Sequence, residues 1–155
     1  MRWITREHPK IDRIACPWLI TRFIDAEAEF MFVPAEKVSR IARQTGSIPF
    51  DIEGVELSHD GPLCSFDAFL RKYNLEGDSA LRQLAAIVRG ADTARLDLAP
   101  QCAGVFAISL GLSRMFSDDH ELLRYGMIMY DALYTWLTEA KEETHTHPER
   151  MISAA

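Results

Sequence analysis

The sequence predicts an α+β fold that is mostly helical, with a small sheet of short strands packed under about six helices. Short apolar runs at residues 3–5 and 29–33 have the composition of strands. From residue 65 onward, apolar residues instead recur at every third or fourth position, which is typical of helices. A length of 155 residues, 48% of them hydrophobic, fits one domain with its own core.

Helices and extended pieces are expected to alternate in the first half of the chain. The first helix opens at Asp12 or Cys16, and its apolar residues then share one face. Residues 35–44 form a second, charged helix that a glycine ends. Residues 48–50 and 55–57 are two further extended pieces. This half is therefore expected to supply the sheet.

The second half is predicted to be helical. Helices are expected over residues 65–73, 79–89, 100–115 and 118–137. The third is apolar almost all round, so we expect it to lie at the centre of the molecule. The chain then turns polar. We expect a single domain over residues 1–140 and a polar, flexible tail over residues 141–155.

Charge and motif content argue against several classes of protein. The formal net charge is −6, which disfavours binding of nucleic acid by this chain alone. No signal peptide or membrane-spanning run is visible, so we expect a cytoplasmic protein with no membrane partner. Neither GxGxxG nor GxxxxGK[ST] occurs, and no nucleotide cofactor is expected. The three cysteines are far apart and odd in number, which argues against a disulfide framework.

The richest local cluster of reactive side chains is HDGPLCSFD at residues 59–67. It places His59, Cys64 and Asp67 in a turn that leads into a helix. Imidazole and carboxylate suit Fe, Mn, Zn or Ni, and a thiolate makes the donor set softer, so one divalent metal ion is a candidate cofactor. The alternative is that His59 is a loop residue, Cys64 a core residue and Asp67 a favourable charge at a helix start. The spacing matches no standard motif, which favours this alternative.

Two other segments carry candidate metal ligands. Asp92 follows a glycine at a helix end, where a carboxylate opposes the helix dipole. His120 lies in SDDHE at the start of the last helix. Turn and capping preferences explain both residues without a ligand. They would complete an open three-donor site only if folding brings them to the first cluster. A further HxH at residues 145–147 lies in the polar tail and is read as incidental.

Arg13 and Cys16 form a different kind of candidate. An arginine near a helix start suits a small oxyanion such as sulfate or phosphate. A cysteine there can act as a reductant or a redox sensor. The structural alternative is an ion pair between Arg13 and Asp12 beside a buried Cys16.

Several sequence blocks resemble the ChrB C-terminal domain family of bacterial chromate-resistance proteins. They are TREHPKIDRIACPWLITRFID, PFDIEGVELSHDGPLCSFDAFL, LAAIVRGADT, ISLGLSRMFSDDHELL and GMIMYDALYTWL, and they occur in the family's order over about residues 3–137. The resemblance implies a sensor or ligand-binding role within chromate resistance. One position departs from the family: Gln101 stands where an acidic residue is usual, so a site that uses that acid would be altered here.

These observations lead to three hypotheses. The first is a cytoplasmic metal- or oxyanion-binding, sensor-type domain associated with chromate resistance. The expected metal ligands are His59, Asp67, Cys64, Asp92 and His120, with Arg13 and Cys16 for anion binding or redox chemistry. The second is a metal- or thiol-dependent redox enzyme acting on chromate or on oxidative by-products. The third is a homodimeric interaction domain with an exposed edge at Tyr130, Tyr134 and Trp136.

Overall fold

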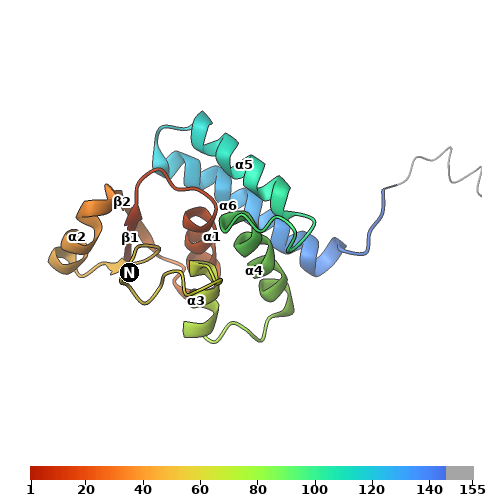
Figure 1. Cartoon of the computed structure of the whole chain (residues 1–155), viewed down its shortest axis with the longest axis horizontal. Helices are drawn as coiled ribbons and strands as arrows, with labels where there is room; N and C mark the ends of the chain where they lie inside the picture. The colour runs from red at the N-terminus through yellow and green to blue at the C-terminus, as the bar shows by residue number, and fades with distance from the viewer. Residues whose placement is uncertain (146–155) are drawn as a thin grey trace, which may run out of the picture.

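The computed structural model describes residues 1–145, in which six α-helices accompany a three-stranded parallel sheet (Figure 1). The strands are β1 (Arg2–Arg6), β2 (Glu29–Val33) and β3 (Ile48–Pro49), in the order β2-β1-β3. Trp3 of β1 is opposite Phe30 on one side and Ile48 on the other. The prediction of a mostly helical α+β fold with a small sheet is confirmed.

The six α-helices are joined to one another and to the strands by turns and loops. They are α1 (Asp12–Leu19), α2 (Val38–Thr45), α3 (Ser65–Lys72), α4 (Ser79–Asp92), α5 (Cys102–Met115) and α6 (Asp119–Thr135). A π-helical turn, Ile20–Ile24, extends α1, and another, Trp136–Ala140, extends α6. The segment 55–57, expected to be extended, is instead part of the loop between β3 and α3. Among these helices none has the length and apolar composition needed to cross a membrane.

The sheet lies between α2 and the other five helices (Figure 1). Successive residues of a strand point to opposite faces, and β1 is buried on both. Ile4 packs with Val38 and Ala42 of α2, whereas Trp3 belongs to the main core. The central strand is therefore covered on each face by a different set of helices.

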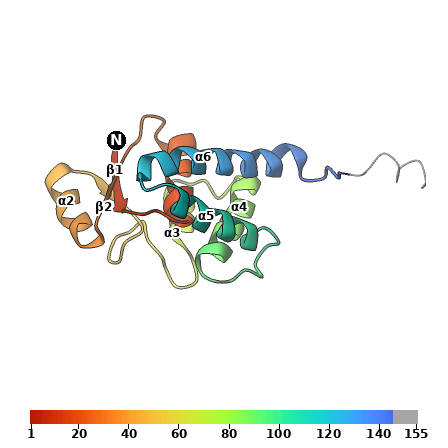
Figure 2. The ribbon, with the colours of Figure 1, turned by 90° about the horizontal axis from the view of Figure 1, so that it is seen from above.

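The central helix is α1, which contacts α3, α4 and α6. Gly126 of α6 allows this packing, because a Cβ there would lie 2.3 Å from Cγ2 of Ile14. The expectation that residues 100–115 form the central helix is wrong. That segment is α5, which lies beside α6 at the outside of the molecule (Figure 2) and exposes Phe106, Ile108 and Met115.

The HxH motif and the polar tail, both expected from the sequence, extend beyond the described residues. Thr146 and His147 of the HxH motif lie outside the described residues, and so does most of the tail at 141–155. The described part of the tail, residues 141–145, is exposed and contains no helix or strand.

Candidate metal centre

Asp12 opens α1 and is buried, with 1% of its surface exposed. Its carboxylate accepts the backbone N–H of Ser65 at 2.7 Å and that of Phe66 at 3.1 Å. These N–H groups belong to the first turn of α3, which has no partner for them within the helix. Ile11, just before Asp12, has a φ of 42°, a left-handed conformation that is strained for a β-branched residue. Strain of this kind is concentrated at functional sites.

His59 lies in the loop between β3 and α3 and meets three carboxylates. Its Nε2 is 2.9 Å from an oxygen of Asp92, 3.3 Å from one of Asp51 and 3.5 Å from one of Asp12. One ligand atom from each of Asp12, His59 and Asp92 can be chosen so that all lie within 4.8 Å of one another. An imidazole N–H can satisfy only one of these acceptors well, so the cluster has more acceptors than one proton can serve.

Asp51 is the third carboxylate, and its other partners are cationic or hydroxyl donors. It accepts the Ser65 hydroxyl at 2.7 Å and an N–H of Arg6 at 3.1 Å, and Nε of Arg13 lies 3.3 Å away. Two guanidinium groups therefore offset its charge. Asp51 is placed to orient His59 more than to bind an ion.

The ionisation of the cluster reflects this crowding of carboxylates. Hydrogen bonding to Asp12 and Asp51 raises the pKa of His59 to about 10. Burial, reinforced by the charges of Asp12 and Asp51, raises the pKa of Asp92 to about 7. Burial also raises the pKa of Asp12. Burial opposes ionisation of Asp51 too, but its hydrogen bonds with His59 and Ser65 and the nearby arginines hold its pKa below the usual value.

The position of the cluster follows from the strand order. From β1 the chain crosses to β2 on one side, and from β2 it crosses to β3 on the other side. Ligands of open parallel sheets bind outside the carboxyl ends of the strands at such a switch point. Arg6 ends β1 and Asp51 follows β3, so both lie at this edge.

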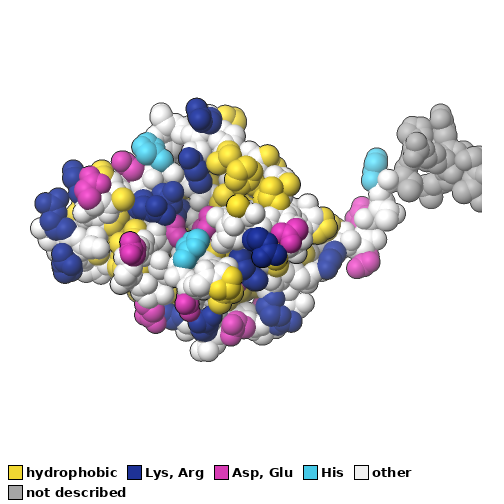
Figure 3. Space-filling model, in the orientation of Figure 1, with side chains coloured by type: hydrophobic (Ala, Val, Ile, Leu, Met, Phe, Trp, Pro, Cys, Tyr) yellow, Lys and Arg dark blue, Asp and Glu magenta, His cyan; other side chains and the backbone are white. Residues whose placement is uncertain are grey.

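An open cleft of about 750 Å³ adjoins the cluster. The cleft is lined by His59, Asp51 and Arg6, and also by Ser39 and Ser58. Figure 3 shows acidic, basic and histidine side chains gathered in the middle of this face. The side chain of His59 is 42% exposed and that of Arg6 is 43% exposed, so both are accessible to a small ligand.

The predicted ligands Asp67 and Cys64 are engaged elsewhere. Asp67 accepts the Cys64 backbone N–H at 3.0 Å and forms a two-point ion pair with Arg89 at 3.1 and 3.3 Å. It therefore caps α3 and links it to α4. The Cys64 thiol is fully buried and donates to Asp67 at 3.3 Å. Burial raises the pKa of Cys64 well above its usual value. Neither residue belongs to the three-residue group around His59.

His120 and Gln101 also lie apart from that group. The His120 ring packs edge-on against Phe32 of β2, with 5.3 Å between the ring centres. Gln101 immediately precedes α5. The structure thus brings together His59 and Asp92 of the expected ligands, but not His120.

Arg13 and Cys16 lie next to the cluster in largely structural roles. Besides its contact with Asp51, Arg13 donates to the backbone oxygens of Arg6 and Glu7 at 3.0 and 2.9 Å. Its guanidinium is mostly engaged, and Arg6 is the more exposed cation. The buried Cys16 thiol donates to Asp12 at 3.2 Å, and burial raises its pKa well above the usual value.

Asp12 and Asp51 are the members of the cluster that the sequence did not identify as site residues. In the sequence, Asp12 looks like an ordinary residue at a helix start. The helix that its carboxylate caps, α3, begins more than fifty residues further on. Asp51 reads as a loop residue. The sequence does carry a signal for Asp12: residues 14–20, which follow it, are all apolar, so the helix is expected to be buried and a carboxylate at its start needs partners.

Comparisons with known proteins identify the family to which the chain belongs. The family described as "ChrB, C-terminal domain" matches residues 3–137, and the chain belongs to that family. It is also similar to Protein ChrB of Cupriavidus metallidurans, with 30% identity over 141 residues. The alignment covers 91% of this chain and 42% of that protein, so the chain spans less than half the length of this relative. No solved structure matches the chain.

Proposed function

We propose that this chain is a divalent-metal-binding domain associated with chromate resistance, and that Asp12, His59 and Asp92 bind the ion. The observation that carries the proposal is the convergence of three carboxylates on a single imidazole nitrogen. Membership of the ChrB family supplies the association with chromate resistance.

The separations of the donor atoms suit one ion. Metal bonds to nitrogen and oxygen of about 2.1 Å place two ligands of one ion roughly 3 to 4.2 Å apart. His59 lies 2.9 Å from Asp92 and 3.5 Å from Asp12. Small side-chain rotations would therefore bring the donors to bonding distance.

The charges of the cluster also favour a cation. Asp12, Asp51 and Asp92 carry three negative charges when ionised, opposed by Arg6 and Arg13. The proton on His59 provides the balancing positive charge in the metal-free protein. A divalent ion would take the place of that proton, leaving His59 neutral and able to donate its nitrogen lone pair.

The donor set narrows the choice of metal. One imidazole and two carboxylates suit Mn²⁺ or Fe²⁺. Zn²⁺ and Ni²⁺ also bind imidazole. The thiols of Cys16 and Cys64 are hydrogen-bonded to Asp12 and Asp67 and are not among the three grouped donors. A soft, thiolate-rich site is therefore disfavoured.

The cleft beside His59 suits a sensor-type domain that takes a small oxyanion. Arg6 supplies an accessible cation in the cleft that His59 also lines. An anion in the cleft would interact with Arg6 and approach the metal from the exposed side of His59. A metal-dependent redox enzyme remains the second candidate, because the same open side would admit a substrate. The thiol-dependent enzyme is disfavoured, since a buried thiol with a raised pKa is a poor nucleophile.

Elemental analysis of the purified protein, together with titration of Mn²⁺, Fe²⁺, Zn²⁺ and Ni²⁺ into chelator-treated protein, tests the proposal. We expect one equivalent of metal in the native protein and loss of that equivalent in His59→Ala and Asp92→Asn. His120→Ala is the matched control, because it removes a histidine outside the cluster and should keep the metal. A His59→Ala variant that binds metal as tightly as the native protein would refute the site.

A further inference from the structure

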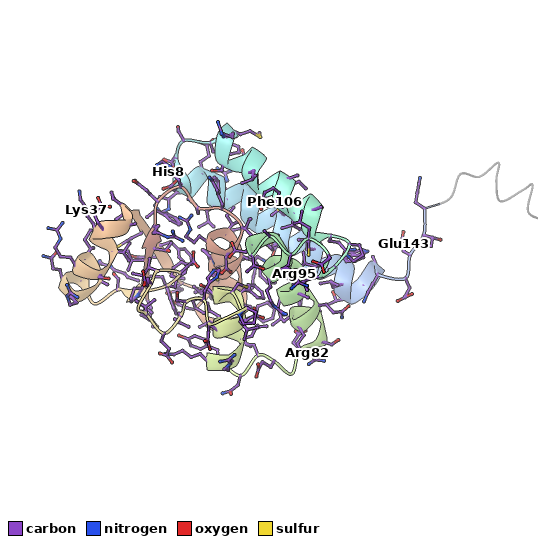
Figure 4. The ribbon with its side chains drawn as sticks, viewed as in Figure 1. His8, Lys37, Arg82, Arg95, Phe106 and Glu143 are labelled. Atoms are coloured by element: carbon purple, nitrogen blue, oxygen red, sulfur yellow. The ribbon has the colours of Figure 1, made fainter. Side chains whose placement is uncertain are left out.

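Exposed apolar side chains are concentrated around α5. Eight large hydrophobic side chains are exposed among the described residues, and all but Met1 lie on α5, on the loop before it or on α6. Three of them, Phe106, Ile108 and Met115, belong to α5 itself. Figure 3 shows hydrophobic side chains gathered over this helix, and Figure 4 labels Phe106 there. A monomeric protein rarely exposes a large contiguous apolar patch without a binding partner.

The outer face of α5 also lacks charge. Residues 102–113 contain no Asp, Glu, Lys or Arg, although the chain as a whole is acidic. A helix exposed to water normally carries charged residues on its outer face. The expected interaction edge at residues 130–136 is not this surface, because Tyr130 is fully buried and Tyr134 and Trp136 are half-buried. α5 is the more exposed surface.

Two glycines in α5 have open space around them within one copy of the chain. A Cβ on Gly104 or Gly111 would meet no atom within 4 Å, so neither glycine is needed for packing. Each destabilises a helix by about 1 kcal/mol relative to alanine. One face of the helix carries a strip of small residues at a spacing of four: Ala103, Ala107 and Gly111. Such a strip of small residues permits close approach by a second helix.

We infer that a second copy of this chain covers the outer face of α5, with α5 crossing its counterpart about a twofold axis near Ala107. In an antiparallel arrangement about that axis, Ala103 faces the partner's Gly111 and Phe106 faces the partner's Ile108. Each of these pairs occurs twice, as an isologous interface requires. Small residues meet small ones, and large residues meet large ones. The uncharged outer face of α5 also lets two copies of an acidic chain meet along this helix without like charges in contact.

The size of the surface agrees with a dimer. The helices α5 and α6 pack side by side and have 14 and 17 residues. A face two helices wide and about 25 Å long covers roughly 500 Å² in each copy. Two such faces bury about 1,000 Å² in total, the lower limit for a specific interface.

Light scattering on the full chain at protein concentrations from about 1 to 100 µM provides the first test, with the concentration range set by the micromolar affinity of small interfaces. We expect twice the mass of one chain at the upper end, and a monomer for Ala107→Glu. Gln44→Glu is the matched control, because it adds the same charge to an exposed position of α2. A monomer at every concentration, or an Ala107→Glu variant that remains dimeric, would overturn the inference.

Cross-linking gives a second test that does not depend on a disruptive substitution. A residue at a twofold axis lies next to its own copy, so Ala107→Cys should form a disulfide-linked dimer on mild oxidation. The three native cysteines are buried and should give little background. Gln44→Cys should stay monomeric on a non-reducing gel. Equal cross-linking of the two variants would contradict a twofold axis at α5.

Discussion

The backbone N–H of Ser65 donates to Asp12 across a distance of 2.7 Å, so a residue of α1 caps the start of α3. Asp12 thus has two roles, as a cap for α3 and as a proposed metal ligand. Asp92 has no backbone N–H of α3 to accept, and it lies at the last residue of α4. This difference lets the structural and metal-binding roles of the carboxylates be separated by mutation.

In chelator at pH 8, we expect Asp12→Asn to lower the free energy of unfolding by about 1–3 kcal/mol, because the amide keeps only one of the two oxygens that accept the N–H groups of Ser65 and Phe66. Asp92→Asn should have little effect or stabilise the metal-free protein, because burial and neighbouring carboxylates disfavour its charge. Both variants should lose metal. Urea denaturation measures the free energy of unfolding, and elemental analysis measures the metal content. Equal destabilisation by the two substitutions would contradict the distinction.

Metal affinity should rise with pH. His59, with a pKa of about 10, is protonated in the metal-free protein throughout the neutral range, so the ion must displace one proton. We expect an increase of about tenfold in affinity per pH unit between pH 7 and 9. The dependence should be steeper below pH 7, where Asp92 also carries a proton. Calorimetry in buffers of different ionisation enthalpy should count about one proton released at pH 8. Metal binding without proton release would argue against His59 as a ligand.

The metal-free protein should lose stability as the pH rises from 7 to 10. The pKa of His59 is raised from 6.5 to about 10, so its stabilising contribution is complete below pH 6.5 and lost as the pH passes through 10. Denaturant titrations in chelator at several pH values would measure this decline. His59→Gln should flatten it, and His120→Gln should not. A decline of the same size in both variants would assign it to other groups.

All three thiols should resist labelling by thiol reagents in the folded protein. Cys16, Cys64 and Cys102 are fully buried, and burial raises the pKa of Cys16 and of Cys64. Ellman's reagent should therefore detect no thiol in buffer and all three after unfolding in guanidinium. Rapid labelling of one thiol in buffer would revive the thiol-dependent enzyme as a candidate.

Gly126→Ala should destabilise the protein by about 1–3 kcal/mol, since the new methyl group would overlap Ile14 in the central helix. Gly77→Ala is the control, because a Cβ at that position meets nothing within 4 Å. Thermal unfolding of the two variants compares them directly. Similar midpoints would mean that α1 and α6 can separate without cost.

The sequence predicted the fold class because strand composition and helical periodicity are local properties. It misjudged which helix is central, because an apolar helix that faces a partner has the same composition as one that fills a core. Residues 102–113 show this ambiguity: they have no charge, yet Phe106 and Ile108 are exposed. Burial of α1 depends instead on its contacts with three other helices.

The candidate site was only partly predictable for a related reason. His59 and Asp92 stood out by residue type and position, but their proximity depends on β3 pairing with β1 rather than β2. The spacing of the residues does not reveal that pairing. Asp67 and His120 share the residue types of the proposed ligands, but Asp67 is paired with Arg89 and His120 packs on Phe32.

The three proposed ligands come from positions 12, 59 and 92, so an unfolded chain would not hold them together. An ion that binds only the folded chain stabilises it by about 2.7 kcal/mol when its free concentration is 100 times the dissociation constant. Such a shift lowers the unfolded fraction available to proteases by about two orders of magnitude. The lifetime of the protein in the cell would then follow the supply of the ion, so that the amount of this domain itself reports metal availability.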